Sequence, residues 1–377
     1  MLLLSGPNIA GNEWKYVKDC LDTCWVSSVG AYVDQFEKMS AAFAGSRYAV
    51  ATSSGTTALH ICLLLMGVNE DDYVITTNIT FIATCNSIKY TGADPILIDA
   101  DPGTWQMDLD LLAAFLANET EQRDDHCHYK KDGRRIPVIM PVHVLGNICD
   151  MDRLMALANK YHIIIIEDST EALGSYYKGR HAGSFGVMGT FSYNGNKIIT
   201  TGGGGMIITD DEKLAIKAKH LTTQAKSDPF EYIHDEIGYN YRLVNMAAAM
   251  GVAQMEQLPV FLQRKLEIIA FYKEELKGCG DIRFQEILPG VKPNWWLPTI
   301  MTDKQKDLLK ILNENQMQSR PFWMPMNQLR MFKENIFYHK ENYSDHIYRR
   351  CMSIPCSTNI TDEQLKTVSD KIKEGMG

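Results

Sequence analysis

Lys197 stands between the turn Asn194-Gly195-Asn196 and an apolar stretch, and a run of four glycines follows at residues 202–205. A lysine partly withdrawn from water loses its proton readily, and the free amine can form a Schiff base with a carbonyl compound. A glycine run is costly in conformational entropy, so this one suggests close approach of the backbone to a ligand. The ordinary alternative is a surface lysine beside a flexible loop.

Acidic side chains follow a run of four isoleucines, residues 163–166, in the sequence Glu167-Asp168-Ser169-Thr170-Glu171. A carboxylate at the end of a buried strand must be hydrogen-bonded, ion-paired or functional. Asp168 could therefore face a cationic atom of a ligand. Glu171 stands three residues further on, a spacing that also occurs where a helix is capped. Both interpretations remain open on these residues alone.

Small hydroxyl residues and a glycine precede an apolar helical stretch, in the segment from Thr52 to Leu59 that contains Gly55 and Thr56. The free N–H groups and the dipole of a helix N-terminus favour a phosphate group. Serine and threonine are also common helix caps, which is the simpler explanation. No Gly-Lys-Ser/Thr follows, so the segment is not a Walker loop.

Seven strand-like apolar runs alternate with longer amphipathic segments, at residues 48–51, 73–76, 95–98, 138–142, 163–166, 189–193 and 206–209. Several are continuously apolar, as expected of strands covered on both faces. Residues 59–66 and 151–161 are predicted crossover helices. This alternation predicts an α/β fold with a mostly parallel sheet covered by helices on both faces. Side chains that follow the strands would then gather at one edge of the sheet.

The chain has 377 residues, too many for one compact core, so two domains are expected. The alternating pattern changes near Asn245, where a helix is predicted over 246–272 and shorter mixed elements follow. We predict a large α/β domain over residues 1–247 and a small C-terminal α+β domain over residues 248–377.

The net charge is −8, and the one basic cluster, around residues 130–135, surrounds a predicted turn, so nucleic acid is not expected as a partner. The N-terminus lacks the pattern of a signal peptide, and the longest apolar stretch is far shorter than the roughly 20 residues that span a bilayer. A cytoplasmic location away from membranes is expected.

Nine cysteines without a Cys-x-x-Cys pair suit a reducing compartment. No metal site is expected at His126-Cys127-His128, because neighbouring residues on a strand point to opposite faces.

In this order and spacing the segments resemble the DegT/DnrJ/EryC1/StrS family of sugar aminotransferases, which have fold type I and depend on pyridoxal 5'-phosphate. The resemblance covers nearly the whole chain, and its matching segments are residues 25–30, 54–59, 80–83, 141–146, 167–168, 192–197, 238–242 and 353–355. Residues 191–197 and 221–226 are similar to a narrower group, the LegC-type aminotransferases of legionaminic acid and bacillosamine pathways. That group implies glutamate as amino donor and UDP-4-keto-6-deoxy-N-acetylglucosamine as acceptor.

The resemblance implies a role for several residues. Lys197 would hold the cofactor covalently and act as general base and acid, Asp168 would face the pyridine nitrogen, and Phe81 would stack on the ring. Glu171 falls near the phenolic oxygen, where many relatives carry glutamine, and His143 matches an active-site histidine without a defined role. Phosphate contacts are implied for Gly55, Thr56, Ser192 and, from a partner subunit, Asn240. The implied assembly is a homodimer with shared active sites.

Contacts to the sugar and nucleotide are expected from the aromatic residues Trp25, Trp296 and Trp323, from Arg320 and from Ser27. Each tryptophan could equally belong to the core of the small domain. The sequence leaves three other functions to consider. Dehydratases of the family carry histidine at the lysine position, so Lys197 argues against them. Transamination of another keto sugar, nucleotide or cyclitol, and a cofactor-binding regulator without turnover, remain open.

Overall fold

The computed structural model describes residues 1–228 and 230–377 and has a large, mostly parallel sheet at its centre. Eight of its strands lie side by side in the order β1 (Tyr48–Thr52), β11 (Gly205–Thr209), β10 (Met188–Ser192), β7 (Ile164–Asp168), β6 (Arg135–Met140), β2 (Asp72–Thr77), β3 (Asp94–Ile98) and β18 (Phe337–Tyr338). Along this path only β11 runs against its neighbours. The hairpin of β4 (Thr120–Arg123) and β5 (His126–Tyr129) extends from β6. The predicted α/β sheet is confirmed.

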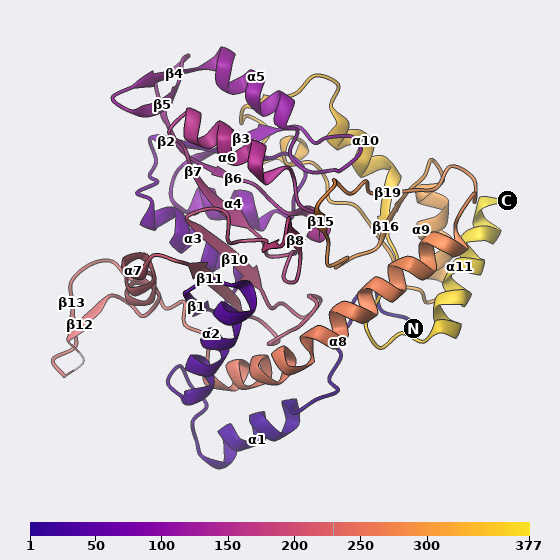
Figure 1. Cartoon of the computed structure of the whole chain (residues 1–377), viewed down its shortest axis with the longest axis horizontal. Helices are drawn as coiled ribbons and strands as arrows, with labels where there is room; N and C mark the ends of the chain where they lie inside the picture. The colour runs from indigo at the N-terminus through magenta and orange to yellow at the C-terminus, as the bar shows by residue number, and fades with distance from the viewer. Residues whose placement is uncertain (229) are drawn as a thin grey trace.

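Helices cover both faces of this sheet, which explains why its strands are apolar on both sides (Figure 1). On one face Val74 packs in a core with residues of α3 (Gly55–Leu65), α4 (Ala83–Tyr90) and α7 (Glu212–Thr222). Its neighbour Ile75 points to the other face, toward α5 (Leu109–Glu119) and α6 (Met151–Lys160). The crossover helices predicted over 59–66 and 151–161 correspond to α3 and α6.

A smaller antiparallel sheet lies in the C-terminal part of the chain, with the order β14 (Arg283–Phe284), β16 (Thr299–Met301), β19 (Cys351–Ser353) and β17 (Arg320–Pro321). It is accompanied by α9 (Gln305–Glu314), α10 (Tyr343–Arg350) and α11 (Asp362–Met376). The N-terminus joins this region, because Leu2 pairs with Met317 and the Cys356 N–H donates to the Leu4 carbonyl.

The long helix α8 (Asn245–Glu275) connects the two regions (Figure 1). It packs against α1 (Glu13–Asp22) and α2 (Ala31–Ala44), and also against α11. The helix predicted over 246–272 is thus present. The predicted domain boundary at 247/248 falls in the first turn of α8 and stays a prediction.

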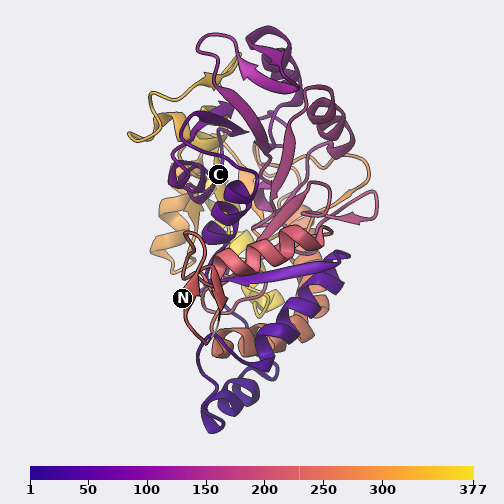
Figure 2. The ribbon, with the colours of Figure 1, turned by 90° about the vertical axis from the view of Figure 1, so that its left-hand side faces the viewer.

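Two small sheets complete the architecture. One contains β15 (Val291–Lys292), β8 (Tyr176–Tyr177) and β9 (Arg180–His181). The other is a hairpin of β12 (Lys226–Asp228) and β13 (Ile233–His234), which projects from the body of the molecule in Figure 1 and lies on the side that faces the viewer in Figure 2. Short 3-10 turns occur at η1 (Val144–Gly146) and η2 (Met326–Gln328). Within residues 1–228 and 230–377, no helix combines the length and apolar character needed to cross a membrane.

Candidate active site

A cavity of about 400 Å³ opens at the carboxyl ends of the central strands, where the small sheet meets the large one. Ligand sites are expected at this edge of an open α/β sheet. The sequence-predicted residues that line the cavity are Gly55, Thr56, Phe81, Ser192, Lys197, Trp296, Arg320 and Trp323. The fold thus brings together residues from both halves of the chain.

The N-terminus of α3 forms one end of the cavity. A capping box closes this helix: the Thr57 N–H donates to Ser54 Oγ and the Ser54 N–H donates to Thr57 Oγ1, both at 3.1 Å. Gly55 lies between them, and a Cβ there would come within 2.9 Å of Thr170 Cγ2 and 3.0 Å of Ser192 Cβ. A glycine therefore lets the helix start pack directly against the ends of β7 and β10. This arrangement suits a phosphate group.

Asp168 ends β7 and is 2% exposed. Its Oδ1 accepts hydrogen bonds from the Thr170 hydroxyl at 2.6 Å and the Thr170 N–H at 3.2 Å. Its Oδ2 accepts from the Thr84 hydroxyl at 2.7 Å. These hydrogen bonds fix the direction of the carboxylate. A buried carboxylate held in this way suits a cationic ring nitrogen.

Lys197 and Glu171 face each other, with 4.0 Å between Lys197 Nζ and Glu171 Oε1. Burial lowers the pKa of Lys197, although the charges of Glu171 and Asp168 oppose this effect. Burial raises the pKa of Glu171 to about 7, against the opposite effect of Lys197. The Leu145 N–H donates to Glu171 Oε2 at 2.7 Å, from a residue with left-handed backbone (φ 59°). Lys197 therefore releases its proton at lower pH than an exposed lysine does.

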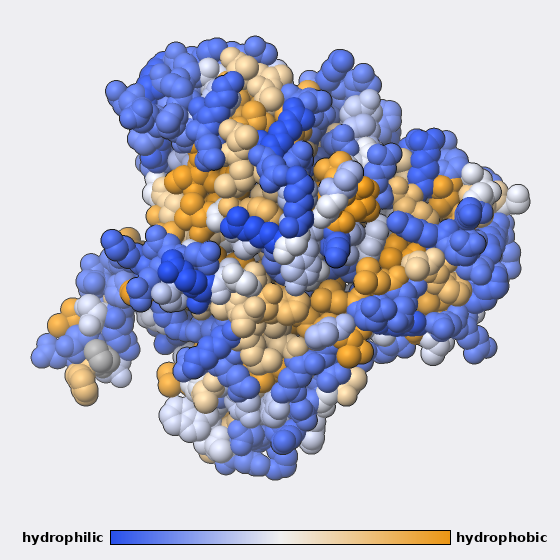
Figure 3. Space-filling model, viewed as in Figure 1, coloured by the Kyte–Doolittle hydropathy of each residue, from blue (hydrophilic) through white to orange (hydrophobic). Residues whose placement is uncertain are grey.

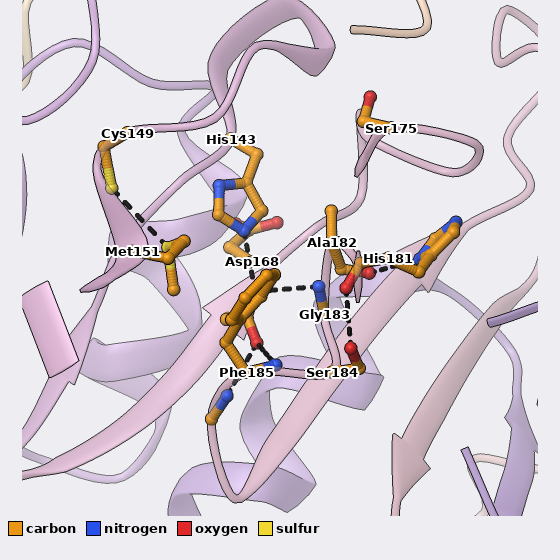
Figure 4. Close-up of polar contacts among 12 residues, drawn as sticks. His143, Cys149, Met151, Asp168, Ser175, His181, Ala182, Gly183, Ser184 and Phe185 are labelled. Atoms are coloured by element: carbon orange, nitrogen blue, oxygen red, sulfur yellow. Dashed lines mark hydrogen bonds and ion pairs between the residues drawn. The ribbon is translucent and has the colours of Figure 1, made fainter. Parts of the chain in front are cut away.

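His143 is fully buried and is not among the residues that line the cavity. Its Nε2 lies 2.9 Å from Glu167 Oε2, and its backbone N–H donates to the Asp168 carbonyl. Glu167 also accepts from the backbone N–H groups of Gly183, Phe185 and Gly186, close to the loop drawn in Figure 4. The structure thus places His143 beside Asp168 (Figure 4). A catalytic role for its side chain stays a prediction.

Six predicted residues do not line the cavity: Asp168, Glu171 and His143 are buried, and the other three are exposed. Trp25 and Ser27 are exposed in the segment before α2, and Asn240 is exposed where it accepts a hydrogen bond from Arg242. The role predicted for Asn240 concerns a partner subunit, so its distance from its own cavity is consistent with that role. The sugar contacts predicted for Trp25 and Ser27 would likewise require an active site that two subunits share.

Several residues of the site were not predicted. Leu4 and Phe322 line the cavity, and Thr84 and Thr170 hold Asp168. The contact of Thr170 could have been predicted from the sequence, because an aspartate side chain often accepts a hydrogen bond from the residue two positions later. Leu4 and Thr84 carried no such local signal, since they reach the site only through tertiary packing.

Comparison with known proteins decides the family. Residues 7–373 match the DegT/DnrJ/EryC1/StrS aminotransferase family. The chain belongs to this family. It is 36% identical to GDP-perosamine synthase of Escherichia coli O157:H7, a match covering 98% of this chain and 96% of that one. It is 35% identical to the putative pyridoxal phosphate-dependent aminotransferase EpsN of Bacillus subtilis, over 96% of this chain and 92% of that one.

Solved structures of sugar aminotransferases share the fold. The pyridoxal-phosphate form of the putative sugar aminotransferase Spr1654 from Streptococcus pneumoniae aligns with a TM-score of 0.89 at 24% identity, over 99% of this chain and 97% of that one. PseC of Helicobacter pylori aligns with a TM-score of 0.87 at 24% identity, over the full length of both chains. The predicted fold type I architecture is confirmed. This family member is a sugar aminotransferase, and its cofactor is pyridoxal 5'-phosphate.

The residues present fit this cofactor. The glycine start of α3 accommodates a phosphate at one end of the cavity, and Asp168 supplies a buried carboxylate for the ring nitrogen. Lys197 supplies an amine with a lowered pKa at the cavity floor, and Phe81 presents a half-exposed aromatic ring in the wall. A phosphate, a cationic ring and an aldehyde thus each find a complementary group.

Proposed function

We propose that this chain transfers the amino group of glutamate to the 4-keto carbon of a nucleotide-linked 6-deoxysugar. The observation that supports this most strongly is that Lys197 and Gly55 line one cavity, with Lys197 Nζ 4.0 Å from Glu171 and with Asp168 hydrogen-bonded to the cavity-lining Thr170. An amine acting as both base and acid needs a lowered pKa, and burial supplies it.

We propose a role for each of the side chains named above. When bound, the cofactor supplies an aldehyde carbon that takes up an amine and a conjugated ring that withdraws electrons. Asp168 holds the positive charge of the ring nitrogen, and the start of α3 with Ser192 holds the phosphate. Lys197 would take a proton from the α-carbon of the amino acid and deliver it to the cofactor carbon that carried the aldehyde. The same lysine runs these transfers in reverse when the keto sugar replaces the amino acid.

The acceptor proposed from the sequence resemblance is UDP-4-keto-6-deoxy-N-acetylglucosamine. A second candidate is the GDP-linked keto precursor of perosamine, which is favoured by the 36% identity to GDP-perosamine synthase of Escherichia coli and the 37% identity to that of Caulobacter vibrioides over 86% of this chain. Both acceptors carry a diphosphate, and Arg320 lines the cavity where a guanidinium could bind it. Trp323 offers an aromatic face to a sugar or base.

A panel of nucleotide keto sugars tests this proposal. Purified protein with cofactor and glutamate is incubated with UDP-linked and GDP-linked 4-keto-6-deoxysugars and with 3-keto sugars, and products are read by mass spectrometry. We expect an amino sugar from a 4-keto acceptor and 2-oxoglutarate in equal amount. A protein whose cofactor absorbance does not change with glutamate would instead be the regulator without turnover.

We further propose a homodimer in which Asn240 completes the partner's phosphate site. The projecting hairpin supports this, because it carries apolar side chains in water: Phe230 is 91% exposed, and Tyr232 and Ile233 are also exposed. Ile237, just before Asn240, is 83% exposed. Part of this projecting hairpin has the colour of hydrophobic residues in Figure 3. Exposed apolar groups of this kind mark interaction surfaces.

A further inference from the structure

Trp296 is held from three directions at the wall of the cavity. Its backbone N–H donates to Asn294 Oδ1 at 2.9 Å, and its indole Nε1–H donates to the Asn196 carbonyl at 2.7 Å. Its own carbonyl accepts a hydrogen bond from Lys265 Nζ at 2.9 Å. The side chain is 3% exposed although it lines the cavity. An indole fixed at both its backbone and its ring nitrogen presents one defined face.

Lys265, on α8, is a buried lysine that the proposed reaction does not use. It is 1% exposed, and besides the Trp296 carbonyl it donates to the Cys356 carbonyl at 2.7 Å and lies 3.3 Å from Cys356 Sγ. A buried ammonium group is stable only when acceptors surround it. Removing it would leave the Cys356 carbonyl without a donor, and would leave the Trp296 carbonyl with only the weak donor Cys356 Sγ at 3.6 Å. Lys265 therefore ties the Trp296 backbone to α8 and to the segment after β19.

The face of Trp296 lies against Lys197. Lys197 Nζ is 3.6 Å from the centroid of the indole ring, while Glu171 Oε1 lies 4.0 Å from the same nitrogen. The amide of Asn294 also donates to the carbonyls of Glu171 and Leu173, at 2.8 and 2.9 Å. The side-chain amide of Asn294 thus contacts both Trp296 and Glu171, the two residues that lie beside the amino group of Lys197.

We propose that Trp296 is a positioning residue that holds the amino group of Lys197, once it is released from the cofactor, beside Glu171 in both halves of the reaction, and that Lys265 acts through Trp296. This rests on the proposed transamination, in which Lys197 must be released and must then move a proton. A lysine side chain has a long flexible stem, so a proton transfer from a defined position requires something to hold it. An aromatic face attracts an ammonium group and serves that purpose. The role differs from the sugar contact that the sequence predicts for Trp296.

The two roles separate in single-turnover measurements of each half-reaction. In Trp296→Leu we expect the glutamate half-reaction and the keto-sugar half-reaction to slow by the same factor, about tenfold, the loss typical of one desolvated cation–aromatic contact. Trp296→Phe keeps an aromatic face and should lose less. A residue that only contacts the sugar would leave the glutamate half-reaction unchanged, which would overturn the proposal.

The matched control is the adjacent tryptophan. Trp295 is also buried, and its ring faces Lys273, with 4.4 Å between Lys273 Nζ and the ring centroid. Trp295 is not among the cavity-lining residues. Trp295→Leu is therefore expected to leave both half-reactions at the wild-type rate. If Trp295→Leu slowed both half-reactions as much as Trp296→Leu does, loss of either tryptophan would be enough to slow them. That result would overturn the proposal.

A second readout needs no turnover. Apoprotein is treated with acetic anhydride at pH 8, and the acetylation rate of Lys197 is measured by mass spectrometry relative to that of Lys273. In Trp296→Leu and in Lys265→Met we expect the rate at Lys197 to rise about tenfold, because the ammonium form loses its aromatic partner and its cover. An unchanged rate in Trp296→Leu would overturn the proposal. Should wild-type protein fail to react with glutamate, the proposed function would fail, while this labelling would still test the placement of Lys197.

Discussion

The hydroxyl of Thr84 donates a hydrogen bond of 2.7 Å to Asp168, although the two residues lie 84 positions apart. Thr84 belongs to α4, after β2, while Asp168 ends β7, so the fold of the parallel sheet brings them together. The position of the carboxylate that we propose to face the ring nitrogen therefore depends on a helix from a distant part of the chain.

Thr84→Val should weaken binding of the cofactor about tenfold, because one hydrogen bond to a charged group contributes roughly 1.5–3 kcal/mol. Titration of apoprotein with pyridoxal phosphate, followed by absorbance, measures the change. Thr91→Val is the matched control: Thr91 caps the same helix, and its hydroxyl donates to the Ile88 carbonyl. Equal weakening in both variants would contradict a specific role for Thr84.

Lys197→Ala should remove the covalent link to the cofactor and lower turnover by a factor of about 10²–10⁴, the range for loss of a general acid–base group. Borohydride reduction followed by peptide mass spectrometry should place the cofactor on Lys197 in wild-type protein and on no lysine in the variant. Circular dichroism checks that the fold is intact. Turnover of the variant at the native rate would contradict the assignment.

Gly55→Ala should disturb the phosphate end of the cavity. The new Cβ would meet Thr170 and Ser192 at 2.9 and 3.0 Å, so the start of α3 must move away from β7 and β10. We expect a loss of about 1–3 kcal/mol in unfolding free energy, typical of overpacking, together with weaker cofactor binding. Gly195→Ala is the control, since a Cβ there meets nothing within 4 Å. Chemical denaturation compares the two.

Glu171→Gln should shift the titration of Lys197 to lower pH. Burial lowers the pKa of Lys197, and the negative charge of Glu171 works in the opposite direction by favouring the ammonium form. Without that charge the pKa of Lys197 falls further, so the neutral amine appears at lower pH. The pH dependence of the rate at which apoprotein takes up pyridoxal phosphate measures this. A shift to higher pH would contradict the pairing, and Glu256→Gln, on the exposed side of α8, should cause none.

Mixing Lys197→Ala with Asn240→Ala tests whether subunits share their sites. In a mixed dimer one site would combine an intact lysine with an intact asparagine from the other chain. Equal mixing of dimers that exchange subunits should then restore about a quarter of wild-type activity. If Asn240 serves the site of its own chain, no site in the mixture is intact and activity stays at the level of the single variants.

Much of the site was predictable because its signals are local. Lys197, Asp168 and Gly55 each follow an apolar run whose length and continuity predict a buried parallel strand, and such strands end at a common edge. The types of these residues then point to amine, carboxylate and phosphate chemistry. The resemblance to a family of aminotransferases rests on the same segments, and the family match confirms it.

Other relationships exist only in the folded chain. Leu4 reaches the cavity because the first residues pair with the small sheet, and Trp296 meets Lys197 because Lys265 and two asparagine residues hold it there. Such contacts join residues that are far apart in sequence, and no spacing or periodicity encodes them. By itself the sequence determined the α/β fold through its local pattern, and its resemblance to the family implied the cofactor and proposed Lys197 as the residue that holds it. Only the tertiary structure decided what surrounds that lysine, because packing between distant segments sets the distances and burial on which its chemistry depends.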